Sequence, residues 1–296
     1  MQTETFLFKP KWPYNLNLSL QRLKRNPIYT FGEEGVRRTL HIGGSLYLIK
    51  IYFQEPGRTE VKVEGVCLEG TMEPERVRGV LERMLSVHQD LHEVYRYMNG
   101  MPKLMHLTRE FEGLHIFREP DLFECMVKLI IGQQITTSFA TDLTRNLIEA
   151  VAKTVFCGER EYYIFPNPDQ VAKLQIDDLA RKKFNRRKAE YIVDFAKQID
   201  EGSIDLFRFH DMADSDVMRD LIKIRGIGPW TATCFMIFGL GRENLVPASD
   251  IGIQKAVQKV YGQSKRPTKD ELLQLAEEWN PIASYVSRYL WETLRA

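Results

Sequence analysis

Residues 221–250, which read LIKIRGIGPWTATCFMIFGLGRENLVPASD, decide the fold of this chain. Two helix-like runs, expected at about 216–224 and 229–238, flank the tight turn Gly226-Ile227-Gly228. Glycines permit backbone angles that are closed to other residues, and they let another backbone come close. Pro229 suits the first position of the second helix, where its missing N–H costs nothing. The stretch therefore predicts two helices joined by a hairpin turn.

The turn and the start of the second helix present backbone amides that have no intrahelical acceptor. We expect Gly226, Gly228 and Thr231 to contribute these amides. Such a cluster is a site for an anion, and a DNA phosphate is the natural candidate. A loop at about 239–252 then delivers one carboxylate, Asp250, directly after Pro247-Ala248-Ser249. The simpler alternative is a glycine-containing turn followed by an exposed loop aspartate.

The composition of the chain narrows the class of protein. Its 296 residues are enough to bury a core and to form two domains or lobes. The net charge of +1 argues against long-range electrostatic capture as the main source of DNA affinity, but it allows a local basic face. Four scattered cysteines without CxxC spacing are typical of a reduced intracellular protein. No signal peptide or membrane span is indicated, so we expect a cytoplasmic protein, nucleoid-associated if bacterial.

The first part of the chain has the pattern of a β-sheet. Residues 45–53 (SLYLIKIYF) are dense in β-branched and aromatic side chains, and residues 59–66 (TEVKVEGV) alternate polar and apolar. Glu55-Pro56-Gly57 separates them as a turn. Residues 14–20 (YNLNLSL) alternate in the same way and are interpreted as a further strand. The pattern changes near residues 70–73, which predicts an N-terminal antiparallel sheet domain over 1–72 and a helical domain over 73–296.

Helical periodicity follows this boundary, with helices predicted over about 77–87 and 91–98. The run EPDLFECMVKLIIGQQITTSFA, residues 119–140, predicts a helix that Gly132-Gln133-Gln134 interrupts. Thr136 or Thr137 can then cap the next helix. Further on, residues 181–188 contain six cations. Such a run is usually a solvated face, so we expect a minority of these side chains to touch phosphate.

The hairpin, the helix and the Pro-x-x-Asp loop together resemble the helix–hairpin–helix motif of the DNA glycosylase superfamily. Gly132-Gln133-Gln134-Ile135-Thr136 is similar to the turn that those enzymes place against the minor groove. The alkylpurine branch has a C-terminal pattern that resembles Trp279, Pro281, Ser284 and Trp291 here. The resemblance covers about residues 111–291. It implies an α+β protein in which a two-lobed all-α glycosylase domain follows the sheet. We interpret the role of the N-terminal sheet as structural.

The resemblance also implies roles for individual residues. Asp250 corresponds to the catalytic carboxylate, and Gln133, Gln134 and Thr136 correspond to DNA-contacting positions. Gln134 occupies the position that fills the space left by an extruded base. Trp230 corresponds to an aromatic wall of the base pocket, where its face would favour a cationic base. The alternative for Trp230 is a core tryptophan under the hairpin.

The activity implied is that of a monofunctional DNA glycosylase that excises alkylated purines from double-stranded DNA. The lyase branch of the superfamily carries a nucleophilic lysine where this chain has Trp230. No cofactor is expected beyond a monovalent cation, Na⁺ or K⁺, on the backbone carbonyls of Ile222, Ile224 and Ile227. The partner would be duplex DNA containing damaged bases, bound by a monomer. A non-enzymatic helix–hairpin–helix protein that binds damaged DNA is the alternative, which would need no carboxylate at this position.

Overall fold

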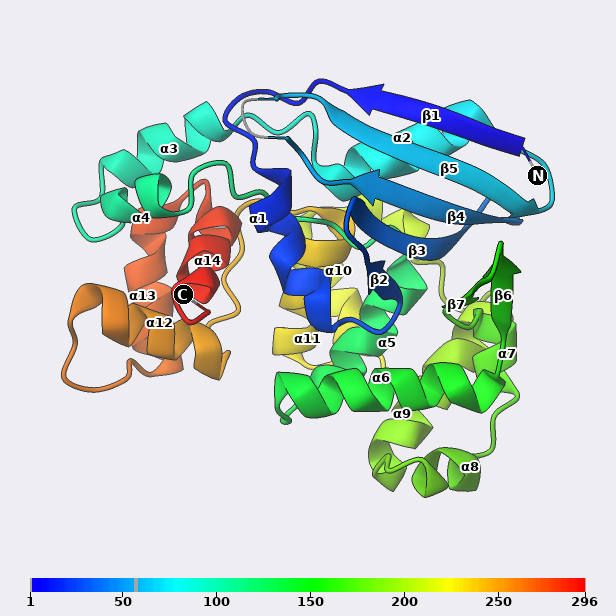
Figure 1. Cartoon of the computed structure of the whole chain (residues 1–296). Coiled ribbons are helices and arrows are strands. Elements are labelled where there is room, and N and C mark those ends of the chain that lie inside the picture. Colours follow the sequence, from blue (N-terminus) through cyan, green and yellow to red (C-terminus); the bar gives the residue numbers. More distant parts are fainter. Residues whose placement is uncertain (1, 56–57, 296) are drawn as a thin grey trace.

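A five-stranded antiparallel sheet lies across one side of the molecule, and helices form the remainder (Figure 1). The computed structural model describes residues 2–55 and 58–295. The strands run in the order β1-β5-β4-β3-β2 and comprise β1 (Gln2–Phe8), β2 (Tyr29–Phe31), β3 (Gly35–Ile42), β4 (Ser45–Tyr52) and β5 (Val61–Glu69). This sheet, followed by the helices, confirms the predicted α+β class.

The strand pair predicted at 45–53 and 59–66 is confirmed as β4 and β5, which pair antiparallel with Ile51 opposite Val63. Of the turn predicted between them, residues 56 and 57 lie outside the described residues. The pattern analysis did not identify β1, β2 or β3. The β3–β4 hairpin closes through Gly43 and Gly44, both with positive φ, which is the backbone that a two-residue hairpin turn requires.

The strand predicted at residues 14–20 is wrong. This segment is the short helix α1 (Leu16–Leu20), followed by the 3₁₀ helix η1 (Gln21–Arg25). The side chain of Asn15 accepts a hydrogen bond from the Leu18 amide at 2.9 Å and so caps the helix. Leu16 and Leu20 are four residues apart, on one helical face, and both are fully buried. An alternating pattern over so few residues fits either structure, and burial of this face favours the helix.

The helical part begins with α2 (Pro74–Leu85) and α3 (Leu91–Asn99), which confirms both predicted helices. The elements that follow are α4 (Met105–Glu110), α5 (Leu122–Gly132), α6 (Thr137–Val151), β6 (Thr154–Cys157), β7 (Arg160–Tyr163), α7 (Pro168–Ala172), α8 (Ile176–Arg181), α9 (Arg186–Asp200), η2 (Phe207–Asp211), α10 (Asp214–Leu221), α11 (Pro229–Phe235), the π-helical turn η3 (Met236–Leu240), α12 (Ile251–Tyr261), α13 (Lys269–Ala276), η4 (Glu277–Trp279) and α14 (Ala283–Glu292). Within the described ranges, no helix is long and apolar enough to cross a membrane.

The helix–hairpin–helix motif is confirmed as α10, the turn and α11. Helix α10 ends three residues earlier than expected, and Ile222 is 46% exposed and so does not belong to the apolar face formed by Val217 and Leu221. Helix α11 begins at Pro229, as predicted, and continues through η3 to Leu240, slightly beyond the expected end.

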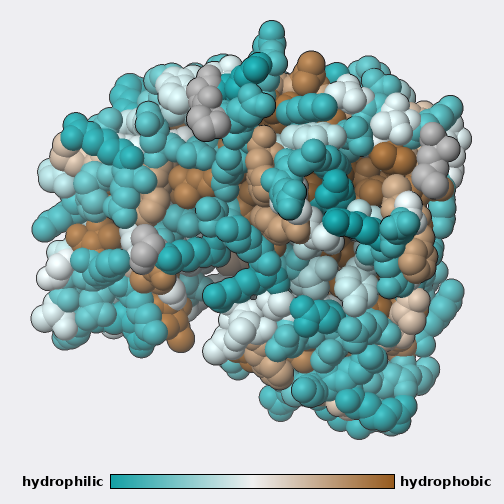
Figure 2. Space-filling view, viewed as in Figure 1, coloured by the Kyte–Doolittle hydropathy of each residue, from teal (hydrophilic) through white to brown (hydrophobic). Residues whose placement is uncertain are grey.

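Two hydrophobic clusters organise the molecule. The first joins the sheet to α5, α6, α9, α10 and α11, so the sheet shares its core with the middle helices. The second joins α3 and α4 to the C-terminal helices α12, α13 and α14. Phe238 and Leu245 pack against both clusters. Figure 2 shows the surface hollowed between the α12–α13 side and the α6–α9 side, with α11 near the upper end of the hollow in Figure 1.

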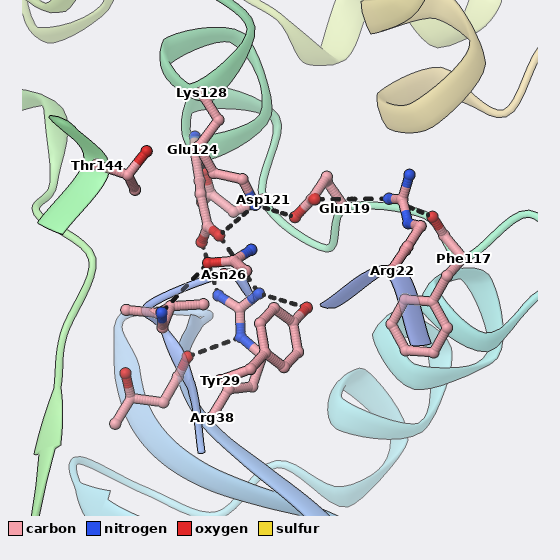
Figure 3. Close-up of polar contacts among 12 residues, drawn as sticks. Arg22, Asn26, Tyr29, Arg38, Phe117, Glu119, Asp121, Glu124, Lys128 and Thr144 are labelled. Atoms are coloured by element: carbon pink, nitrogen blue, oxygen red, sulfur yellow. Dashed lines mark hydrogen bonds and ion pairs between the residues drawn. The ribbon is translucent and has the colours of Figure 1, made fainter. Parts of the chain in front are cut away.

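A buried ion network ties the sheet to the start of α5 (Figure 3). The guanidinium of Arg38 on β3 pairs with Glu124 at 2.6 Å, and Lys128 lies 3.1 Å from Glu124 and 2.8 Å from Glu119. Glu119 in turn lies 3.7 Å from Arg22. Burial alone would lower the pKa of Arg38, but the adjacent Glu124 carboxylate more than reverses that effect. The network therefore buries opposite charges together and fixes α5 against the sheet.

Candidate active site

The loop after η3 places Asp250 at the N-cap of α12. The Asp250 amide donates to the carbonyl of Pro247 at 2.8 Å, which closes the turn predicted from the Pro247-Ala248-Ser249 sequence. The Asp250 Oδ1 atom accepts a hydrogen bond from the Ile253 amide at 2.8 Å, in the geometry of a helix cap. The rotamer of this carboxylate is therefore fixed by its own helix.

Two indole rings complete the surroundings of Asp250. Trp230 donates its Nε1–H to Asp250 Oδ2 at 2.9 Å, and Trp291 donates its Nε1–H to Oδ1 at 3.0 Å. All three hydrogen-bond donors to this carboxylate are uncharged. Among the residues that the structure describes, no lysine, arginine or histidine forms an ion pair with it. The carboxylate thus keeps its charge uncompensated while being rigidly oriented.

The contact between Trp291 and Asp250 was not predicted from the sequence, which placed Trp291 only in the C-terminal pattern. Its ring packs on Phe238 with a centroid distance of 5.7 Å, and the Arg22 guanidinium lies 4.5 Å from the centroid of the same Phe238 ring. At Gly252, a Cβ atom would lie 2.8 Å from Asp250 Oδ1 and 3.4 Å from the Trp291 ring. The glycine after Ile251 therefore permits the indole and the carboxylate to meet.

Trp230 is half-buried at the start of α11, so it is not the fully buried core tryptophan of the alternative interpretation. Besides contacting Asp250, it lines a cavity of about 380 Å³ between the hairpin and α13. The loop from Asn244 to Ser249 forms another wall, but Asp250 is not among the lining residues. Trp230 thus stands between this cavity and the carboxylate. The neighbouring Cys234 is buried, and burial, followed by the charge of Asp250, raises the pKa of its thiol.

Only one of the two hairpin glycines, Gly226, has a backbone conformation that favours glycine. Gly226 has φ +89°, and a Cβ there would overlap the ring of Tyr191 on α9. Gly228 has an extended backbone, φ −97° and ψ 176°, which other residues also adopt, so the expected backbone requirement is wrong for Gly228. A Cβ at Gly228 would meet no atom within 4 Å. The side of the hairpin at Gly228 is therefore open.

The structure brings the Gly132-Gln133-Gln134 turn directly against the hairpin. Gln133 Nε2 donates to the Gly226 carbonyl and to Thr231 Oγ1, both at 2.8 Å. Thr231 is 1% exposed, so its hydroxyl serves this internal contact rather than the surface. Gln134 has φ +55°, a left-handed conformation that is uncommon outside glycine. Thr136 caps α6, as predicted, by accepting from the Phe139 amide at 3.3 Å.

The cations of residues 181–188 do not share one environment. Arg181, Lys182 and Arg186 pair with nearby carboxylates. Lys188 is 6% exposed and donates to the carbonyls of Ile131 and Gln133, each at 2.7 Å. The composition of the run did not indicate that this lysine would be buried. The run is therefore only partly the solvated face that its composition indicates.

The three carbonyls expected to hold a cation lie directly after α10, at its C-cap residue Ile222 and in the hairpin that follows. Ile224 accepts from the Ile227 amide at 3.0 Å. Within the described chain, no backbone amide outside the regular helices donates to the carbonyl of Ile222 or Ile227. Two of the three oxygens are thus available, and neutral carbonyls at a helix C-terminus suit a monovalent cation. No group of three or more His, Cys, Asp or Glu side chains suited to a metal occurs in the described ranges.

Comparisons with known proteins agree with this geometry. The profile described as HhH-GPD superfamily base excision DNA repair protein matches residues 127–281. The Bacillus subtilis protein YfjP, named as a candidate DNA-3-methyladenine glycosylase, is 34% identical over 95% of this chain and 96% of its own. A second B. subtilis protein, named DNA-3-methyladenine glycosylase, is 32% identical over 74% of this chain and 73% of its own. The solved 3-methyladenine DNA glycosylase of Archaeoglobus fulgidus has a TM-score of 0.86 and 25% identity, over 98% of both chains.

Proposed function

Because the chain belongs to the HhH-GPD superfamily of base excision DNA repair proteins, we propose that it is a monofunctional DNA glycosylase for alkylated purines. It takes a damaged purine of the 3-methyladenine or 7-methylguanine type out of the duplex and hydrolyses its N-glycosidic bond, leaving an abasic site. The observation that carries the proposal is the Asp250 carboxylate, oriented by three neutral donors. The names of the relatives point to the same class of substrate.

Asp250 supplies the charge that the reaction needs. Departure of the base leaves positive charge on the sugar, and a carboxylate fixed nearby stabilises that charge without reorganising. It can also orient or deprotonate the attacking water. An ionised carboxylate offers about four acceptor positions. Three hydrogen bonds are formed inside the protein, so acceptor capacity remains for the substrate side.

The hairpin and the neighbouring turn bind the DNA in this proposal. The amides around Gly226, Gly228 and Thr231 hold a backbone phosphate at the start of α11. Gln133 and Thr136 fix the turn near the minor groove, and Gln134 enters the space vacated by the base. A monovalent cation on the carbonyls of Ile222, Ile224 and Ile227 would neutralise part of the phosphate charge. The protein is expected to act as a monomer.

The base is recognised by aromatic faces. Trp230 and Trp291 both contact the Asp250 carboxylate, and the Trp291 ring also packs on Phe238. Electron-rich rings attract a cationic ligand, and an alkylated purine carries formal positive charge. Because both indole N–H groups bind Asp250, their rings are held in place before the base arrives.

Release of free base is the direct test. Duplex DNA treated with a methylating agent is incubated with the protein, and the soluble products are separated by chromatography. We expect methylated purines to appear in the supernatant with the parent protein and not with Asp250→Asn. The non-enzymatic alternative, a damage-binding helix–hairpin–helix protein, predicts binding to the same DNA with no released base.

The monofunctional assignment has a separate test. A lyase forms an imine between a lysine and the sugar, which borohydride traps as a covalent protein–DNA adduct. Trp230 occupies the position of that lysine, so no adduct should form and abasic strands should break only after alkali. Lys223 pairs with Asp220 at 2.9 Å, whereas Lys255 is exposed on α12, five residues after Asp250. A trapped band that disappears in Lys255→Ala would show that the enzyme is a lyase.

A further inference from the structure

Lys188 lies in the first turn of α9 and is a buried cation without a carboxylate partner in the described structure. Its Nζ atom donates to the carbonyls of Ile131 and Gln133, at 2.7 Å each. Both carbonyls belong to the C-terminal end of α5, where the helix dipole favours positive charge. Burial lowers the pKa of Lys188, so its position costs free energy. Through the Gln133 carbonyl, Lys188 contacts the turn that contains Gln134.

The turn that Lys188 contacts is strained. Gln134 adopts φ +55°, and a left-handed backbone is energetically unfavourable for a non-glycine residue. Such conformations persist only where the surroundings fix them. Here the residue before it is held on both sides, because Lys188 binds the Gln133 carbonyl and the Gln133 side chain binds the hairpin at Gly226 and Thr231.

The same helix also holds the hairpin. Tyr191, three residues after Lys188 and thus on the same face of α9, packs its ring where a Cβ of Gly226 would lie. Arg225, next to that glycine, pairs with Glu190 at 2.6 Å and with Asp194 at 2.7 Å, both on α9. One helix therefore fixes the hairpin and the Gln134 turn relative to each other, and Lys188 is its contact with the turn.

We propose that Lys188 is a positioning residue for base extrusion, which holds the Gln133–Gln134 turn in the shape that enters the DNA stack. This inference rests on the proposed glycosylase function. Extrusion must overcome unstacking and unpairing of the target base. A turn that is only partly in the competent shape lowers the effective affinity for the extruded state by the same fraction. No hydrogen bond or ion pair of Lys188 reaches Asp250 among the described residues, so the bond-breaking step itself is left unchanged.

The test compares one lesion in two DNA contexts. Single-turnover excision of 7-methylguanine is measured opposite cytosine, where the base is paired, and opposite an abasic-site analogue, where no partner holds it. We expect Lys188→Met to slow excision about tenfold in the paired context, the size of one lost charged hydrogen bond, and less than about twofold in the unpaired one. Lys188→Arg, which keeps the charge and donors, should restore most of the paired rate. Lys197→Met, an exposed lysine on the same helix, serves as the control.

The results distinguish failure of the role inferred for Lys188 from failure of the proposed glycosylase function. Equal slowing in both contexts would show a merely structural role and would overturn the inference while the parent enzyme remains a glycosylase. A parent protein that releases no base from either duplex would reject the function and the inference together. If Lys188→Met does not fold at the assay temperature, Lys188→Gln replaces it, and the same selective loss is expected with a smaller size.

Discussion

Glu124 and Asp250 are two carboxylates that the protein holds in opposite ways. Glu124 is 1% exposed and lies between two cations, Arg38 at 2.6 Å and Lys128 at 3.1 Å. Asp250 is half-buried and is held by the Trp230 and Trp291 indoles and a backbone amide. The first arrangement joins the sheet to α5. The second fixes a negative charge at the junction of the two hydrophobic clusters.

The difference shows how charge is used in each region. A buried charge is costly unless opposite charges or strong hydrogen bonds lie close by, and the Glu124 carboxylate is neutralised by two adjacent cations. Neutralising Asp250 in that way would leave it little attraction for a cationic sugar. Neutral donors orient the carboxylate and leave its net charge for the transition state. The two sites therefore respond differently to the same chemical change, conversion of a carboxylate to an amide.

The largest effect on stability is expected at Glu124. Glu124→Gln leaves the Arg38 guanidinium buried without its carboxylate, which should lower the free energy of unfolding by about 3–5 kcal/mol. Urea denaturation measures this loss. Glu93→Gln, which breaks an exposed pair with Arg96, should leave the free energy of unfolding almost unchanged. Equal losses in the two variants would mean that the buried network contributes no more than a surface pair.

At Asp250 the same substitution should spare the fold and remove the activity. Asn is also a good N-cap, so α12 keeps its first hydrogen bond in Asp250→Asn. Base release should fall by about 10²–10³-fold, because an amide cannot balance the charge on the sugar. Chromatography of released base gives the rate, and Glu243→Gln, an exposed carboxylate on the same loop, is the control. Excision at close to the parent rate would remove Asp250 from the mechanism.

His115 shows a third way to bury an ionisable group, namely uncharged. It is 1% exposed, and burial lowers its pKa to about 4. The unfolded chain, with a histidine pKa of about 6.5, binds the proton first on acidification. Stability is therefore present above about pH 6.5 and falls as the pH approaches 4, by about 2 kcal/mol between pH 7 and 5. Urea denaturation at both pH values should show this difference shrinking in His115→Leu and persisting in His106→Leu, which replaces an exposed histidine.

The smallest effect on the rate of base release is expected at Trp291. Trp291→Phe removes one N–H donor but retains an aromatic ring to stack on Phe238. Loss of one hydrogen bond of about 1 kcal/mol should slow base release about fivefold, with little change in DNA binding. Trp279→Phe removes a comparable donor, to Tyr261 in the second cluster, and should leave the rate unchanged. An unaltered rate in Trp291→Phe would mean that its hydrogen bond does not orient the carboxylate.

The sequence by itself determined the features that depend on neighbouring residues. Pro229 and Gly226 mark the hairpin because a fixed φ and a left-handed turn are properties of single residues. The β4–β5 pair and the helices α2, α3, α5 and α6 follow from the periodicity of apolar side chains. Residues 14–20 show the limit of such patterns, since a seven-residue alternation did not reveal which face would be buried.

The tertiary structure alone decided which distant side chains meet. Trp291 reaches Asp250 from 41 residues away, Gln133 reaches Thr231 from 98, and Arg38 reaches Glu124 from 86. These contacts leave no local periodicity, because each depends on where two helices or a helix and a strand cross. The buried contact of Lys188 with α5 is of the same kind: a run of six cations looks uniform in sequence, and only packing selects the one that faces inward.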